Sequence, residues 1–111
     1  FNNTNNCAEF CIMRMDLYAN GTMNSVIPWR NDCDINPISP QYGTWQYDRN
    51  GWCPGAAVLD HRVDLTDQLV PGQDNVLDFD IRMYNGEEYN NVNPDSWSPF
   101  MEVTLQLLIY E

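Results

Sequence analysis

The sequence predicts an all-β domain, built as a sandwich of antiparallel strands, and three observations support this prediction. Several segments alternate apolar and polar residues with a period of two, the pattern of a strand with one buried face. Asn-Gly pairs follow two of these segments, and this dipeptide favours the tight turn of a β-hairpin. No segment keeps a helical period over three turns. The length fits one domain, 1–111.

The first half of the chain predicts one hairpin followed by a long loop. A strand is expected over 12–18, Asn20-Gly21 marks the turn, and 22–28 forms the return strand. Residues 29–55 show little regular pattern and are rich in proline and glycine. A loop of that length in a compact domain is functional or is tied down. The apolar face of the first strand is formed by Met13, Met15 and Leu17.

The second half predicts three further strands. A short strand is expected at 63–65, and a connection with a Pro-Gly turn follows it. An alternating strand covers 76–84 and ends at Asn85-Gly86. A final strand is expected over 100–110. The inward residues of the last two strands are Leu77, Phe79, Ile81, Met83, Met101, Val103, Leu105, Leu107 and Ile109.

The acidic composition of the chain disfavours two classes of binding partner. Sixteen acidic residues against five basic ones give a net charge of −11, which argues against nucleic acid or an anionic membrane surface as partner. No apolar run approaches the roughly 20 residues needed to span a bilayer, so no membrane insertion is expected. His61 is the single histidine and is expected to be structural or to face solvent.

Acidic pairs raise the question of a metal site. Ca²⁺ takes several oxygen ligands, but acids are expected anyway on the polar face of an amphipathic strand. We therefore expect no metal and no cofactor. The pairs are Asp32/Asp34, Asp78/Asp80 and Glu87/Glu88.

Four cysteines, at 7, 11, 33 and 53, allow three disulfide pairings. A four-cysteine zinc site usually has a close pair at each end, and only Cys7 and Cys11 form one here. Disulfides are therefore expected, and they indicate a secreted or otherwise oxidising setting. If Cys7 pairs with Cys11, the residues between them must turn, with Glu9 at the middle of the arc. Sequons at Asn2 and Asn20 are candidate glycosylation sites.

Three motifs carry a family resemblance. They are Cys7-Ala-Glu-Phe-Cys11, Cys33-Asp-Ile-Asn-Pro-Ile38 and Asp48-Arg-Asn-Gly-Trp-Cys-Pro-Gly-Ala-Ala-Val58. In these the chain resembles the C-terminal domain of the peptide-N-glycosidase F family, where the elements read close to CAEWC, CxxNPI and DRxGWCPGxAV. The specific motifs fall within 7–64, and a strand pattern continues the resemblance to Tyr110.

The resemblance implies a jelly-roll sandwich and the disulfides Cys7–Cys11 and Cys33–Cys53. It implies that this chain is the later part of that domain, with the first strands and the N-terminal domain absent. The family enzyme hydrolyses the amide between an asparagine side chain and the first N-acetylglucosamine of an N-glycan, without a metal. Glu9 matches its active-site glutamate, and Arg49 and Trp52 match residues near its glycan-binding cleft.

Two departures from the family limit what the resemblance implies. The family's catalytic aspartate lies in the N-terminal domain, so whether this chain is an enzyme is left open. The small loop carries Phe10 where the family has Trp, and Met13-Arg14-Met15-Asp16 stands where the family has a histidine-containing run.

Two functions follow as hypotheses. In the first, the chain supplies the Glu9 half of an amidase site acting on N-glycosylated protein, and a partner segment supplies the aspartate. In the second, it is a noncatalytic extracellular module for adhesion or assembly that pairs its strands with another chain. Both expect a partner chain or precursor segment that supplies the first strands.

Overall fold

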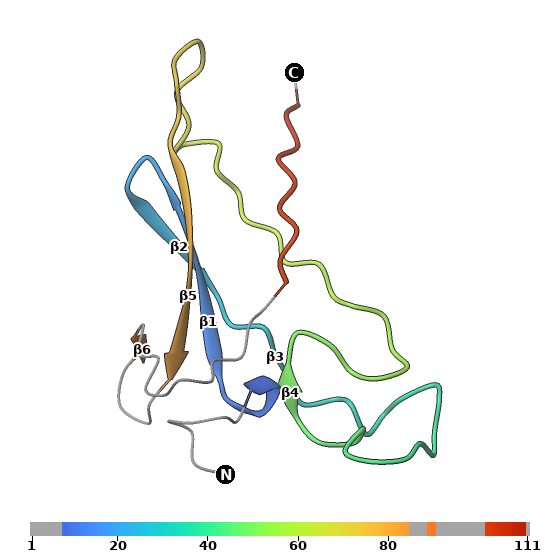
Figure 1. The fold of residues 1–111 in the computed structure, drawn as a ribbon. Coiled ribbons are helices and arrows are strands. Elements are labelled where there is room, and N and C mark those ends of the chain that lie inside the picture. The colour runs from blue at the N-terminus through green and yellow to red at the C-terminus, as the bar shows by residue number, and fades with distance from the viewer. Residues whose placement is uncertain (1–7, 85–88, 91–101, 111) are drawn as a thin grey trace.

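The computed structural model describes residues 8–84, 89–90 and 102–110, which form antiparallel sheets and one short 3-10 helix (Figure 1). One sheet has the strand order β2-β1-β5-β6, and a second pairs β3 with β4. The described residues confirm the predicted all-β class. The elements are η1 (Ala8–Phe10), β1 (Met13–Ala19), β2 (Thr22–Val26), β3 (Trp29–Arg30), β4 (Arg49–Asn50), β5 (Leu77–Tyr84) and β6 (Tyr89–Asn90).

The predicted hairpin is confirmed as β1 and β2. Asn20 and Gly21 both have positive φ angles, 49° and 86°, as the two-residue turn of a hairpin requires. Val26 ends β2, two residues before the predicted end, because Pro28 has no amide hydrogen with which to extend the ladder.

β5 pairs with the other edge of β1 and confirms the predicted alternation of faces. Met15 lies opposite Ile81 and Leu17 opposite Phe79, so apolar residues share one face. The other face is polar, with the cross-strand pairs Arg14–Arg82, Asp16–Asp80 and Tyr18–Asp78. The turn expected at Asn85-Gly86 lies outside the described residues.

Asp16 departs from the expectation for a polar face, because its side chain is fully buried. Arg14 donates two hydrogen bonds to it, at 2.7 and 2.9 Å, and Ser25 donates another at 2.8 Å. A nitrogen of Arg82 lies 3.3 Å from its second oxygen. Burial raises the pKa of Asp16, but the hydrogen bonds and these two positive charges outweigh it, so the pKa is lowered.

Two predicted strands are wrong for the residues that the structure describes. Residues 63–65 and 102–110 carry no strand pairing. Figure 1 shows 102–110 as an extended segment beside the sheet. Alternation predicts an extended backbone, but a strand also needs a neighbour for its amides and carbonyls. Residues 100–101 of that prediction lie outside the described ranges.

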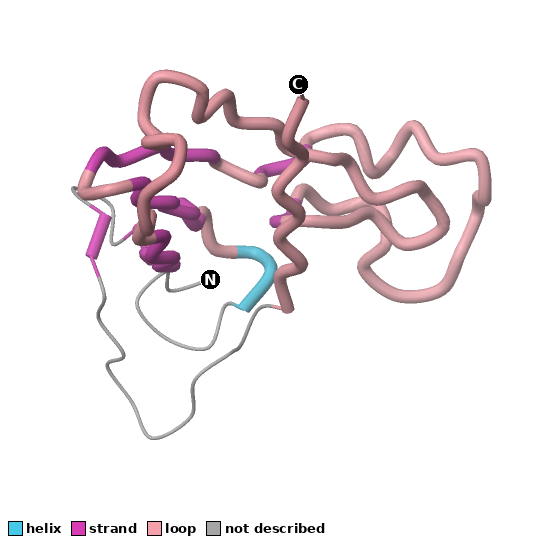
Figure 2. The backbone as a smooth tube through the Cα atoms, turned by 90° about the horizontal axis from the view of Figure 1, so that it is seen from above, coloured by secondary structure: helices cyan, strands magenta, loops and turns pink. Residues whose placement is uncertain are grey.

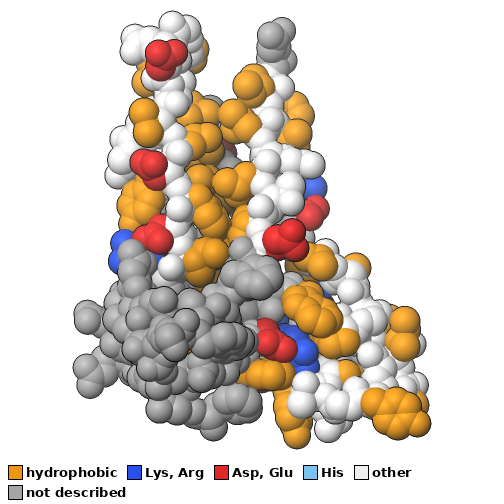
Figure 3. Space-filling model, in the orientation of Figure 1, with side chains coloured by type: hydrophobic (Ala, Val, Ile, Leu, Met, Phe, Trp, Pro, Cys, Tyr) orange, Lys and Arg blue, Asp and Glu red, His pale blue; other side chains and the backbone are white. Residues whose placement is uncertain are grey.

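The apolar face of the sheet looks toward 102–110, and hydrophobic side chains gather between the two (Figure 3). The space is only partly filled, since Leu77 and Leu105 are exposed over 43% and 58% of their surface. The radius of gyration is 16.5 Å, whereas a compact domain of this length has about 13 Å. The sandwich is therefore open on this side.

The loop between β3 and β4 extends away from the larger sheet (Figure 2). Cys33 and Cys53 form the predicted disulfide across it, and both are buried. The loop places β4 beside η1, and this contact builds the candidate site. Within the described ranges there is no helix with the length and apolar character that crossing a bilayer requires.

Candidate functional site

Glu9, Arg49 and Trp52, the predicted site residues, lie together where η1 meets β4. A side-chain nitrogen of Arg49 is 3.9 Å from a carboxylate oxygen of Glu9. The guanidinium carbon is 4.9 Å from the ring centre of Phe10 and 5.6 Å from that of Trp52. We call these four side chains the Glu9 cluster.

Arg49 is the buried centre of the Glu9 cluster, with 3% of its side chain exposed. Its Nε donates to the carbonyl of Tyr47 at 3.2 Å, and its Nη2 donates to the carbonyl of Thr44. The guanidinium plane also suits contact with aromatic faces. Arg49 therefore fixes the end of the disulfide loop and both rings in one arrangement.

Glu9 and Trp52 carry the accessible surface of the Glu9 cluster. The Glu9 side chain is 38% exposed and Trp52 is 47% exposed. A half-exposed carboxylate beside a half-exposed indole offers a hydrogen-bond acceptor and an apolar ring to one ligand. That combination suits a sugar, which has hydroxyl groups at its rim and apolar faces.

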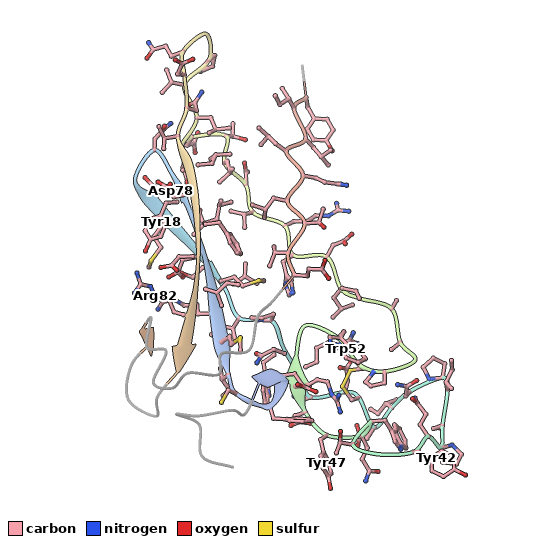
Figure 4. The ribbon with its side chains drawn as sticks, viewed as in Figure 1. Tyr18, Tyr42, Tyr47, Trp52, Asp78 and Arg82 are labelled. Atoms are coloured by element: carbon pink, nitrogen blue, oxygen red, sulfur yellow. A yellow bond between two sulfur atoms is a disulfide. The ribbon has the colours of Figure 1, made fainter. Side chains whose placement is uncertain are left out.

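Tyr47 and Asn50 belong to the same site but were not predicted from the sequence. The Tyr47 ring meets the Phe10 ring edge-on, with centres 6.4 Å apart, and 54% of Tyr47 is exposed (Figure 4). Asn50 is buried and binds the backbone around η1. The one signal in the sequence was their position within two residues of Arg49. Tyr42 lies apart from them, at the outer end of the same loop (Figure 4).

Hydrogen bonds hold the second motif, 33–38, against the third motif, 48–58. Gln41 donates to the carbonyl of Pro54 at 2.7 Å, and Asn36 donates to the same carbonyl. The Asn36 side chain also accepts from the amide of Ile38 at 2.9 Å. These bonds and the Cys33–Cys53 disulfide hold both motifs against one another next to Trp52.

The other residues that the sequence singled out lie away from the Glu9 cluster or outside the described residues. His61 is exposed. Cys7 and Asn2 lie outside the described residues, so the Cys7–Cys11 pairing and the first sequon stay predictions. Cys11 itself is buried. Among the residues that the structure describes, no three His, Cys, Asp or Glu side chains form a group that could hold a metal ion.

Asn20, the second sequon asparagine, is exposed, but both hydrogens of its side-chain amide are used. They are donated to the carbonyl of Gln68 at 2.9 Å and to Oδ1 of Asn75 at 2.8 Å. Its own Oδ1 accepts from the amide of Val76 at 2.9 Å. We call these residues the Asn20 network. A glycan on this nitrogen would replace one of these hydrogens, and glycosylation there stays a prediction.

Comparison with known proteins identifies the family of this chain. The sequence profile of the family described as "Peptide-N-glycosidase F, C terminal" matches residues 2–100. The peptide-N(4)-(N-acetyl-beta-D-glucosaminyl)asparagine amidase F of Elizabethkingia miricola is 28% identical over 97 residues. The match covers 82% of this chain and 25% of the relative, so the chain spans about a quarter of that protein's length. No solved structure matches the chain.

Proposed function

Because this chain belongs to the peptide-N-glycosidase F, C-terminal family, we propose that it acts on N-glycosylated protein through the Glu9 cluster. In this proposal the chain supplies one half of a site that hydrolyses the bond between asparagine and glycan. A second carboxylate, the aspartate that the family resemblance implies, comes from another segment or chain. The observation that carries the proposal is that buried Arg49 lies against both the accessible Glu9 carboxylate and the exposed Trp52 indole.

Each side chain of the Glu9 cluster has a role that suits its chemistry. The Glu9 carboxylate accepts a hydrogen bond from a sugar hydroxyl or orients a water molecule. Trp52 covers the apolar face of a sugar ring. Arg49 is too deeply buried and too fully engaged to be a second open subsite. Its role is to hold Glu9 and Trp52 at a fixed separation.

The setting proposed for this activity is extracellular. A disulfide such as Cys33–Cys53 persists in oxidising compartments and is rare in the cytosol. Glycoproteins are met in the same setting, so the proposed substrate and the proposed location agree.

The test uses the native protein with whatever segments accompany this chain. Release of glycan from an N-glycopeptide is measured for the wild type, for Glu9→Gln and for the matched control Glu102→Gln. Glu102 is exposed and lies outside the Glu9 cluster. We expect release by the wild type and the control, and a loss of at least about tenfold in Glu9→Gln. No release by the wild type would refute hydrolysis.

A second function, a noncatalytic module that assembles by strand pairing, is favoured by one observation. Residues 102–110 are extended and carry no strand pairing, although their sequence alternates as a strand. Unpaired, apolar strands are templates for another chain. The test is the mass of the native particle by light scattering. A particle that contains no chain besides this one and no second copy would refute assembly.

A further inference from the structure

The Asn50 side chain binds three backbone groups of the segment that carries Glu9. Its Oδ1 accepts from the amide of Met13 at 3.2 Å. Its Nδ2 donates to the carbonyl of Glu9 at 3.2 Å and to the carbonyl of Cys11. Only 2% of Asn50 is exposed, so water cannot readily take over these bonds.

These three bonds take the place of the backbone hydrogen bonds that a longer helix would form internally. A single 3-10 turn of three residues leaves its last carbonyls without partners inside the helix. Buried carbonyls need a donor, and Asn50 supplies one for Glu9 and one for Cys11. The bond from Met13, the first residue of β1, joins β4 to the larger sheet, and Asn50 thereby links η1 to that sheet as well.

Asn50 and Arg49 are neighbours on β4, and both contact Glu9, one at its main chain and the other at its carboxylate. Asn50 bonds the main chain of Glu9, while Arg49 lies 3.9 Å from its carboxylate. The hydrogen bond holds the main chain of Glu9, and the nearby guanidinium attracts its carboxylate toward one direction. This is the arrangement that a preorganised carboxylate requires, because small displacements at a reacting centre are costly.

We propose that Asn50 is a positioning residue of the Glu9 site, which sets the Glu9 main chain so that the carboxylate faces its ligand. The inference rests on the proposed function for the identity of that ligand.

The chain offers a matched pair of variants. Asn50→Asp keeps the size and the acceptor for Met13 but removes both donors and sets a carboxylate against two carbonyls. Asn20→Asp makes the same change in the exposed Asn20 network at the other end of β1, where aspartate also tolerates the positive φ. Asn50→Ala then removes the acceptor as well.

Kinetics of glycopeptide hydrolysis by the native protein give the first readout. We expect Asn50→Asp to lower kcat about tenfold or more, because the carboxylate is misplaced, with KM changed less than about threefold. Asn20→Asp should keep both constants. A kcat for Asn50→Asp equal to that of the wild type would overturn the proposal.

Hydrogen exchange and carboxyl NMR give a readout that does not need hydrolysis. The Met13 amide should stay protected in Asn50→Asp and lose protection in Asn50→Ala, and the Glu9 carboxyl signal should shift in both but not in Asn20→Asp. If the wild type releases no glycan, the proposed function fails and this readout alone decides the role of Asn50. An unshifted Glu9 signal in both Asn50 variants would then overturn it.

Discussion

β1 is held at each end by an asparagine side chain, and the two ends differ in burial and in what they hold. At its start, buried Asn50 joins β1 to η1 and β4, next to the Glu9 cluster. At its end, exposed Asn20 joins the hairpin turn to Gln68, Asn75 and Val76. The residues between them span roughly 20 Å at about 3.3 Å each, so changes at one end should leave the other intact.

Similar hydrogen bonds therefore have different effects at the two ends of β1. Water competes for the hydrogen bonds of the exposed Asn20 network. These bonds position a loop, and losing them lowers the free energy of unfolding only a little. The buried bonds of Asn50 have no such substitute. The start of β1 is therefore the rigid end, and it is the end that carries an accessible carboxylate and indole.

The largest expected effect comes from removing the disulfide at the rigid end. Replacing Cys33 and Cys53 by Ala should lower the free energy of unfolding by about 3 kcal/mol, because the bridge closes a long loop. Urea unfolding measures the loss. Hydrogen exchange should rise first at 49–53, with the Asn20 network still protected. Equal opening at both ends would contradict the comparison.

The next effect compares the two asparagines directly. Asn50→Asp should lower the free energy of unfolding by roughly 2 kcal/mol, because buried carbonyls lose their donors. Asn20→Asp should cost about 1 kcal/mol or less, since water replaces the lost bonds. Both are measured by urea unfolding at neutral pH. Equal losses would show that burial does not separate the two ends.

A smaller effect concerns acid stability and Asp16, midway along β1. Its pKa is lowered in the folded chain, so it binds fewer protons there than in the unfolded chain. Its contribution is present above about pH 4, the ordinary range of an aspartate, and is lost as pH falls through the folded value. In Asp16→Asn, the free energy of unfolding should therefore decrease less steeply than in the wild type as the pH falls below about 4.

The matched control for this titration is Asp67→Asn, an exposed aspartate in a turn. Asp67→Asn removes one carboxylate and leaves the hydrogen bonds of Asp16 in place, so its stability in acid is the reference with which Asp16→Asn is compared. Arg14, Arg82 and Asp80 are the charged groups around Asp16. An unchanged slope in Asp16→Asn would contradict the lowered pKa.

The smallest effect is expected in the open part of the sandwich. Leu107 is 50% exposed, so Leu107→Lys should change the free energy of unfolding of the isolated chain by less than about 0.5 kcal/mol. Leu17→Ala on β1 is the comparison and should cost more. If the native protein assembles through 102–110, the same Leu107→Lys should weaken its association in light scattering.

Much of this fold could be predicted from the sequence because it is local. Alternation and an Asn-Gly pair predicted β1, the turn and β5, and the motif resemblance implied Cys33–Cys53 and the grouping of Glu9 with Arg49 and Trp52. In each case the signal lies in neighbouring residues or in a family pattern.

The rest depended on contacts between distant residues. Asn50 binds backbone groups that are 37 to 41 positions away in the sequence, and no local sequence pattern predicts such a bond. Asp16 is buried because Arg82 and Ser25 from neighbouring strands cover it. Residues 63–65 and 102–110 were predicted as strands because alternation indicates an extended chain, but it does not supply the partner strand.

The most direct test of the account is an NMR titration with an N-glycopeptide, comparing the two ends of β1. The account predicts that the signals of Glu9, Arg49 and the Trp52 indole shift on addition of the glycopeptide, that those of Asn20 and Asn75 do not, and that Glu9→Gln weakens the response. Shifts confined to the Asn20 end, or an unchanged spectrum for the native protein at millimolar glycopeptide, would contradict it.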